Sequence, residues 1–250
     1  MQLNIKSATN VGKVRDHNED DYVALRGDEI EIPVDALLVV ADGMGGHAAG
    51  EVASRLTVEG IVQAMKHLSG HDRLLEGNEF GAFLSNMMKE VNAQVWQAGQ
   101  EPAHRGMGTT CTLAAIRETQ LFLSQVGDSR CYLLRNGDLH QLTTDHSWVE
   151  EAVAQGILTP EQARVHPNRN VITRAIGIHP TVEVDTTTMP ILQGDLLLLC
   201  SDGLNSMIDD NEIKSILETN YIDQVCEVLV ERANDRGGHD NTTIIVVVID

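Results

Sequence analysis

The sequence predicts an α+β protein built as a sandwich, in which sheets and helices form separate layers. The first observation is the order of the predicted elements, which runs strands, two helices, strands, two helices and a final strand. Alternating βαβ units would instead interleave single strands with single helices. The second observation is the final strand, 242–249, which is apolar on both faces and therefore belongs inside a sheet.

The first half of the chain supplies a small sheet and a pair of helices. Strands are expected at 2–8, 22–25 and 37–41, with a polar turn at 28–35. Apolar residues then recur at helical spacing, first from Gly50 to Leu68 and then from Phe83 to Trp96. Two successive helices after a sheet indicate an αα-hairpin that lies on that sheet.

The second half repeats this arrangement. Strands are expected at 109–116, 121–126 and 130–134 as an antiparallel meander, followed by a hairpin turn at Asn136-Gly137. Further strands are expected at 182–186 and 196–200, and helices at 209–217 and 222–234. The segment 145–178 contains two short helical stretches and a break at His166-Pro167, which is typical of a mobile flap over a site.

The composition limits the classes of partner. The 250 residues contain no linker, repeat or low-complexity stretch, so a single domain over 1–250 is expected. A formal net charge of −19 argues against nucleic acid or an anionic membrane as the partner. The apolar runs are too short to span a bilayer, and the four cysteines match no metal or redox motif. We expect a soluble, cytoplasmic monomer with reduced cysteines.

Four aspartates stand at the edges of apolar runs, three of them beside a glycine: Asp42, Asp128, Asp202 and Asp240. A turn at the end of a strand explains any one of them alone. Four together predict one cleft, where the carboxylates would repel each other unless a cation lay between them. Oxygen ligands favour magnesium or manganese, and no CxxC or HExxH pattern points to zinc.

Two more segments could complete such a site. Residues 12–21 combine Arg15 with several carboxylates, among them Glu19 and Asp20. The arginine fork suits phosphate oxygens, although this segment by itself is also typical of a solvated turn. Gly43 follows Asp42, and a glycine there lets the backbone carbonyl approach an ion. The surrounding glycine run lacks GxGxxG and a Walker lysine, so it argues only weakly for nucleotide binding.

Six motifs, in one order along the chain, resemble the bacterial branch of the metal-dependent Ser/Thr protein phosphatases, the phosphatase 2C type. They are Arg-x-x-x-Glu-Asp at 15–20, Asp-Gly-Met-Gly-Gly-His at 42–47, Gly-Met-Gly-Thr-Thr at 106–110, Val-Gly-Asp-Ser-Arg at 126–130, Cys-Ser-Asp-Gly at 200–203 and Gly-Gly-His-Asp-Asn at 237–241.

The resemblance implies a four-layer αββα sandwich, with two antiparallel sheets flanked by pairs of antiparallel helices and a metal centre at one end. It implies two Mn²⁺ or Mg²⁺ ions in the core and a third, weaker site. Asp42 would bridge both core ions, with Asp202 and Asp240 on one of them. The Gly43 carbonyl and the pair Glu19 and Asp20 would lie near the other, partly through water. Asp128 would join Asp202 at the third site.

The activity that the resemblance implies is hydrolysis of phosphoserine and phosphothreonine by in-line attack of a metal-bridging water or hydroxide. Arg15 matches the phosphate-binding arginine, and Arg15 and Asp42 are the expected catalytic residues. The substrates would be phosphorylated proteins, opposite a cytoplasmic Ser/Thr kinase. The general acid stays open between His47 and a water on the third metal, because Met44 occupies the position where animal members carry a histidine.

Two other functions remain as alternatives. A non-catalytic phosphoprotein-binding member of the fold would have no reason to retain the full acidic set. A small-phosphoester hydrolase would share the site and differ only in substrate preference. A cysteine nucleophile at Cys200 is disfavoured, because no Cys-x5-Arg phosphate loop occurs at any cysteine.

Overall fold

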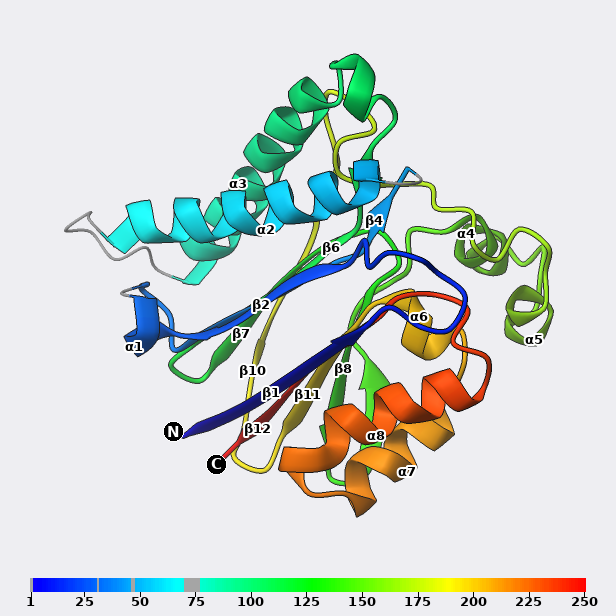
Figure 1. Cartoon of the computed structure of the whole chain (residues 1–250). Helices are drawn as coiled ribbons and strands as arrows, with labels where there is room; N and C mark the ends of the chain where they lie inside the picture. The colour runs from blue at the N-terminus through cyan, green and yellow to red at the C-terminus, as the bar shows by residue number, and fades with distance from the viewer. Residues whose placement is uncertain (1, 31, 46–47, 70–76) are drawn as a thin grey trace.

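The computed structural model describes residues 2–30, 32–45, 48–69 and 77–250, and it contains two stacked antiparallel sheets (Figure 1). The first sheet has the spatial order β10 (Asp185–Pro190), β7 (Gln120–Val126), β6 (Cys111–Arg117), β3 (Ala36–Ala41) and β2 (Asp21–Arg26). The second sheet has the order β1 (Leu3–Asn10), β12 (Thr242–Ile249), β11 (Leu196–Cys200), β8 (Arg130–Arg135) and β9 (Asp138–Gln141). A short ribbon pairs β4 (Gly43–Met44) with β5 (Gly108–Thr109).

Helices cover the outer face of each sheet (Figure 1). The first sheet packs against α2 (Ala48–Ser69) and α3 (Gly77–Ala98), and the second against α7 (Asp210–Thr219) and α8 (Ile222–Asp235). Shorter elements are α1 (Gly27–Ile30), a 3-10 turn (Pro102–His104), α4 (Trp148–Ala154), α5 (Pro160–Arg164) and α6 (Asp202–Asn205). The layers confirm the predicted αββα sandwich.

Alternating side chains on the central strands build the three core layers. On β3, Leu37 and Val39 point to the α2–α3 layer, whereas Leu38 and Val40 point to the core between the sheets. On β12, Ile245, Val247 and Ile249 enter the core between the sheets, and Ile244 and Val246 face α7 and α8. Because both faces of these strands are buried, their sequences are apolar throughout. The prediction that 242–249 is an interior strand is confirmed, since β12 lies between β1 and β11.

The predicted antiparallel meander over 109–134 is confirmed for its first two strands and is wrong for the third. Strands β6 and β7 pair in the first sheet, but β8 pairs with β11 and β9 in the second. The chain crosses between the sheets at 127–129, where Gly127 has a positive φ of 104°. This crossing carries Asp128 to the end of the sandwich. Hydrophobic periodicity could not show the crossing, because strands of either sheet have the same buried pattern.

Gly127 should tolerate no side chain. A Cβ built at this residue would lie 2.5 Å from the Thr110 side chain, in a backbone conformation that residues other than glycine avoid. We expect Gly127→Ala to lower the free energy of unfolding by about 2 kcal/mol or more. Gly194→Ala is the matched control, because Gly194 also has a positive φ but has no atom within 4 Å of the added Cβ. Equal losses in urea unfolding would contradict the argument from close packing.

Smaller differences concern two boundaries. The strand expected at 182–186 starts instead at Asp185, and Val182 and Val184 pack beside the core under α3. The turn expected at 28–35 begins with the short helix α1. The hairpin at Asn136-Gly137 is confirmed, with φ values of 53° and 78° between β8 and β9.

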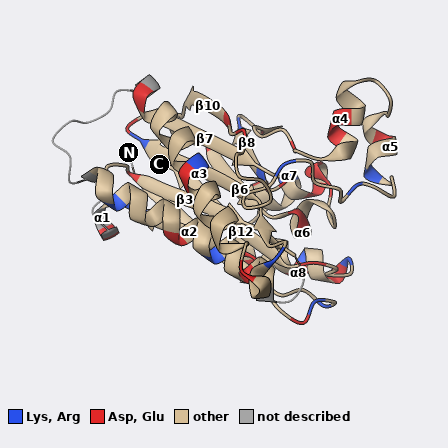
Figure 2. Cartoon of the chain, turned by 90° about the horizontal axis from the view of Figure 1, so that it is seen from above, with Lys and Arg blue, Asp and Glu red and all other residues tan. Residues whose placement is uncertain are grey.

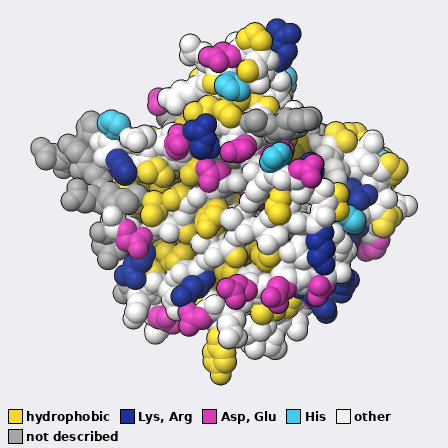
Figure 3. Space-filling model, in the orientation of Figure 1, with side chains coloured by type: hydrophobic (Ala, Val, Ile, Leu, Met, Phe, Trp, Pro, Cys, Tyr) yellow, Lys and Arg dark blue, Asp and Glu magenta, His cyan; other side chains and the backbone are white. Residues whose placement is uncertain are grey.

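The surface carries charges of both signs. In the described ranges, no helix is long and apolar enough to cross a membrane. Figure 2 shows Lys and Arg as well as Asp and Glu spread over the helices and loops. On the face drawn in Figure 3, basic and acidic side chains stand among hydrophobic ones. The net charge of −19 therefore does not describe every face.

Candidate metal centre

The four predicted aspartates adjoin elements that lie at one end of the sandwich, where Figure 1 labels β4 and α6. Asp42 follows β3 directly, and Asp128 lies in the crossing from β7 to β8. Asp202 begins α6 immediately after β11, and Asp240 lies just before β12. Each aspartate is thus fixed by the end of a buried strand, which explains why the sequence pattern locates them.

Electrostatic coupling indicates that these carboxylates lie close together. Desolvation raises the pKa of Asp42 well above its ordinary value, and the charges of Asp20, Asp202, Asp128 and Asp240 raise it further. Burial likewise raises the pKa of Asp202 to about 6 and that of Asp20 to about 7, and the charge of Asp240 adds to both shifts. The pKa of Asp128 is raised well above its ordinary value, first by burial and then by the charge of Asp202. Clustered carboxylates with raised pKa values are typical of a cation site.

Two unpartnered oxygens fit the same interpretation. Asp20 Oδ1 and Asp128 Oδ1 are buried and accept no hydrogen bond. Among the described residues, however, no group of three or more His, Cys, Asp or Glu side chains is arranged to hold a metal ion as it stands. Backbone carbonyls and waters supply part of the shell of a hard cation, so a site of this kind does not need three side-chain ligands. The donor set, which is all oxygen, fits magnesium or manganese.

The backbone of Asp42 is fixed by the Gly-Met-Gly-Thr-Thr motif. The Thr110 N–H donates to the Asp42 carbonyl at 2.9 Å, and the Asp42 N–H donates to Thr110 Oγ1 at 3.0 Å. The Thr109 hydroxyl donates to the same carbonyl at 2.9 Å. Thr110 Oγ1 also lies 2.7 Å from Ser129 Oγ, so the strand ends that carry Asp42 and Asp128 are joined through side chains.

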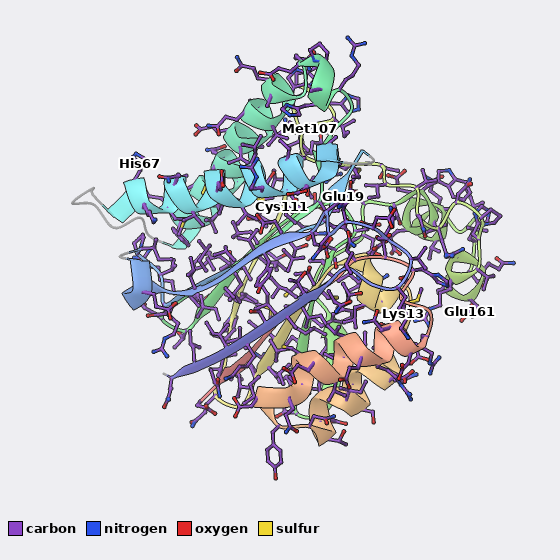
Figure 4. All side chains as sticks on the ribbon, in the orientation of Figure 1. Lys13, Glu19, His67, Met107, Cys111 and Glu161 are labelled. Carbon is purple, nitrogen blue, oxygen red and sulfur yellow. The ribbon has the colours of Figure 1, made fainter. Side chains whose placement is uncertain are left out.

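Gly43 occupies a position where only glycine fits. A Cβ there would lie 2.4 Å from the backbone oxygens of both Glu19 and Gly50. The Gly43 N–H donates to the Glu19 carbonyl at 3.2 Å, and the Ser54 hydroxyl donates to the same carbonyl at 2.6 Å. The Glu19 carboxylate lies against Gly50 near the start of α2, at the end of the sandwich seen in Figure 4.

The predicted acidic pair separates in the structure. Glu19 faces α2, whereas Asp20 Oδ2 accepts a hydrogen bond from the Ser201 hydroxyl at 2.8 Å. Ser201 Oγ in turn accepts from the Thr243 N–H at 2.9 Å. Of the two, Asp20 therefore belongs to the electrostatically coupled cluster with Asp42 and Asp202.

Arg15 reaches this cluster from the loop between β1 and β2. Its Nη2 donates to Asp240 Oδ2 at 2.6 Å, and the side chain remains half exposed. The hydrogen bond to Asp240 raises the pKa of Arg15, which desolvation lowers and the charges of Asp240, Glu19 and Asp42 raise further. The positively charged guanidinium group of Arg15 thus lies at the edge of the acidic cluster, and part of it is open to solvent.

A second arginine, Arg130, is largely but not fully buried and lies close to Asp128 in sequence. Arg130 donates through Nε and Nη2 to both carboxylate oxygens of Asp145, at 2.7–3.0 Å, and its Nη1 donates to the Tyr132 hydroxyl at 2.8 Å. The charge of Arg130 lowers the pKa of Asp128 and so offsets part of the effect of burial. Sequence reasoning assigned no role to Arg130, Asp145, Thr110 or Ser201. All of these except Asp145 lie inside the six motifs, which is the signal that could have marked them.

The remaining expectations concern the general acid and the flap. His47 lies outside the described residues, and Met44 lies in β4 beside the cleft. The segment 145–178 contains α4 and α5, which project beside this end of the sandwich in Figure 1. Ser147 caps α4, and a capping box at Thr159 begins α5.

The αββα sandwich and the carboxylates clustered at one end agree with the class that the six motifs resemble, the metal-dependent phosphatases. Residues 13–241 match the family model described as protein phosphatase 2C, and this chain belongs to that family. The resemblance seen in the six motifs is thereby confirmed.

Curated relatives match over nearly the whole chain. The serine/threonine phosphatase stp of Listeria welshimeri is 40% identical over 241 residues, covering 96% of this chain and 93% of the relative. The protein phosphatase PhpP of Streptococcus pneumoniae is 38% identical over 249 residues, covering 98% and 97%.

Solved structures agree with the fold. The Streptococcus agalactiae serine/threonine phosphatase superposes with a TM-score of 0.90 at 33% identity, with 100% of both chains covered. The catalytic domain of the serine/threonine phosphatase PstP in complex with two manganese ions gives a TM-score of 0.84 at 35% identity, covering 99% of both chains.

Proposed function

We propose that this chain is a metal-dependent protein phosphatase that hydrolyses phosphoserine and phosphothreonine. The observation that carries the proposal is the acidic cleft at the end of the sandwich with Arg15 at its rim, in a chain of the phosphatase 2C family. Its relatives are named serine/threonine phosphatases, and one related structure contains two manganese ions. Divalent cations explain why the fold retains buried, mutually repelling carboxylates.

The proposed ligand assignment follows the positions of the donors. Asp42 would hold both core cations, Asp202 and Asp240 would hold one of them, and the Gly43 carbonyl would hold the other. Asp20, which is held by Ser201, and Glu19, whose carboxylate lies against Gly50, would lie near the second cation, partly through water. Asp128, with its buried unpartnered oxygen, serves a third and weaker site together with Asp202.

When bound, the cations supply a water of lowered pKa as the nucleophile and neutralise charge on the phosphoryl group. The rest of the reaction belongs to the protein. Arg15 binds the phosphate oxygens through its fork and orients the ester for in-line attack. The half-buried cleft around Asp42 and Asp202 lowers the local dielectric, so that each charge interaction is stronger than in water. The four cysteines are buried and unpaired, which is consistent with a structural role.

The cellular setting follows from the same chemistry. The substrates are phosphorylated proteins, supplied by a Ser/Thr kinase that this enzyme opposes. Four unpaired thiols suit a reducing compartment, which supports the cytoplasm as the place of action. In this proposal, residues 1–250 form one catalytic domain that acts as a monomer, and residues 145–178 form its flap.

A comparison of substrates tests the proposal against its alternatives. A phosphothreonine peptide and p-nitrophenyl phosphate are each incubated with the protein, with Mn²⁺ or with chelator. We expect Mn²⁺-dependent phosphate release from both. Release from the small ester alone would favour a small-phosphoester hydrolase. Absence of release from both, with bound Mn²⁺ demonstrated by calorimetry, would favour a phosphoprotein-binding protein.

Removing the Arg15 side chain should weaken phosphate binding more than metal binding. We expect Arg15→Ala to lower kcat/KM for the phosphothreonine peptide on the order of a hundredfold, because a charge-assisted hydrogen bond to the phosphoryl group is lost. Inhibition by inorganic phosphate should weaken in parallel. Arg26→Ala, an exposed arginine on β2, is the control and should change neither constant. Unchanged phosphate inhibition in Arg15→Ala would exclude the proposed role.

A further inference from the structure

Asn241 is a buried polar residue to which the proposed chemistry gives no role. It follows Asp240 at the end of the Gly-Gly-His-Asp-Asn motif, and 4% of its surface is exposed. A buried side-chain amide requires partners for two N–H groups and one carbonyl oxygen. The partners that Asn241 has indicate what it does.

All three hydrogen bonds of the amide go to the loop that carries Arg15. The Asn241 Nδ2 group donates to the Val11 and His17 carbonyls, each at 2.9 Å, and Oδ1 accepts from the Glu19 N–H at 2.8 Å. Val11 precedes Arg15, and His17 and Glu19 follow it. The Asn241 side chain therefore holds together the part of the loop before Arg15 and the part after it.

The part of the loop around Arg15 also contacts the segment that carries Asn241. Residues 11–20 form no helix or strand and connect β1 to β2 around the outside of the cleft, where Figure 4 labels Lys13 (Figures 1 and 4). The Lys13 N–H donates to the Gly238 carbonyl at 2.7 Å. Gly12 packs so closely that a Cβ there would lie 2.5 Å from the Asp240 carbonyl oxygen. These contacts also come from the segment before β12, so residues 238–241 support the loop on both sides of Arg15. Its end at Glu19 and Asp20 is held in addition by Gly43, Ser54 and Ser201.

We infer that Asn241 is the positioning residue for Arg15, holding the loop so that the guanidinium group faces the phosphoryl group of the substrate. This inference rests on the proposed function. The dipeptide Asp240-Asn241 contacts both parts of the loop, because Asp240 binds the Arg15 guanidinium group and Asn241 binds the backbone on either side. Binding energy at Arg15 then depends on an amide that does not itself touch the substrate.

Two substitutions remove the donors in different ways. Asn241→Asp keeps the shape but sets a carboxylate against the Val11 and His17 carbonyls, which can only accept hydrogen bonds. Asn241→Ala removes the donors without adding a charge beside Asp240. An effect shared by both variants therefore comes from the lost donors.

Asn92→Asp is the matched control. Asn92 is also buried, and its amide also holds a loop, since Oδ1 accepts from the Gly177 N–H at 2.8 Å and Nδ2 donates to the His179 carbonyl at 3.0 Å. This loop lies at the end of the segment 145–178, whereas Asn241 holds the loop that carries Arg15. Asn92→Asp thus reports the cost of disturbing a buried asparagine that holds a different loop, and this cost should not depend on Arg15.

The experiment is a double-mutant cycle that combines each Asn241 variant with Arg15→Ala at saturating Mn²⁺. Two quantities are measured: the inhibition constant of inorganic phosphate and kcat/KM for the phosphothreonine peptide. With Arg15 present, we expect both Asn241 variants to weaken phosphate inhibition and lower kcat/KM on the order of tenfold or more. With Arg15 replaced by alanine, the same variants should change either constant by less than about threefold. Asn92→Asp should have the same effect in both backgrounds.

Three results would overturn the inference. One is an equal loss in the presence and absence of Arg15. Another is a loss of Mn²⁺ affinity, measured by calorimetry on Asn241→Ala, that accounts for the whole effect through Asp240. The third is an unchanged phosphate inhibition constant in both Asn241 variants. If thermal unfolding shows that a variant does not fold, Asn241→Ser, which keeps one donor, takes its place and should show a smaller loss. A native protein that binds Mn²⁺ without hydrolysing either ester would refute the proposed function instead.

Discussion

Asp42→Asn should abolish metal-dependent phosphate release, with a loss in kcat/KM of about a thousandfold or more, because the proposed bridge between the two core cations is removed. The same substitution should stabilise the protein in chelator. Asp42 is crowded by Asp20, Asp202 and Asp128, and a neutral amide removes the central charge of this repelling group. Activity and metal-free stability should therefore move in opposite directions, measured by phosphate release and thermal unfolding.

Asp21→Asn is the control for this prediction. Asp21 begins β2 and is also partly buried, and desolvation raises its pKa, but its charged neighbours are Glu59 and Arg55. It should retain Mn²⁺-dependent activity. A fall in unfolding temperature for Asp42→Asn in chelator would show that the Asp42 carboxylate stabilises the fold, and the account of the cleft as a repelling cluster would be wrong.

Without metal, the carboxylate cluster should make the protein less stable as the pH rises from about 4 to about 7. Burial raises the pKa of Asp202 to about 6 and that of Asp20 to about 7, from an ordinary value of 3.8. Folding therefore favours the protonated forms. Their contribution to the free energy of unfolding is complete below the ordinary pKa. It is lost as the pH rises through the pKa values of the folded protein. The loss is about 1.4 kcal/mol for each pH unit and each carboxyl group concerned.

Mn²⁺ should remove this trend. The cation holds the carboxylates ionised, so the stabilisation that it provides should grow over the same pH interval. Urea unfolding at pH 4, 5, 6 and 7, with chelator and with saturating Mn²⁺, measures both effects. Asp202→Asn in chelator should show a shallower slope than the native protein. Parallel curves with and without Mn²⁺ would contradict the prediction.

The layers of the fold could be predicted from the sequence because buried strands appear in it as apolar runs. The run at 242–249 is apolar on both faces and proved to lie inside the second sheet. The assignment of strands to sheets could not be predicted. β7 and β8 have similar buried patterns, and only the three-dimensional path around Gly127 separates them.

The charged residues of the candidate site could be predicted from the sequence, but the contacts that hold them in place could not. Asp42, Asp128, Asp202 and Asp240 stand at strand ends, which the sequence marks by an aspartate after an apolar run or before one. The divergence of Glu19 and Asp20 depends on Gly50 and Ser201, which lie far away in sequence. The amide contacts of Asn241 likewise span more than 220 residues, a relation that local patterns do not contain.

The most direct measurement is phosphate release from a phosphothreonine peptide during a titration of chelator-stripped protein with Mn²⁺, with Asp202→Asn measured in parallel. The account predicts no release without metal, release that saturates as Mn²⁺ binds, and little release from the variant at any concentration. Release that is independent of Mn²⁺, or equal release by Asp202→Asn, would contradict catalysis by cations held in this cleft.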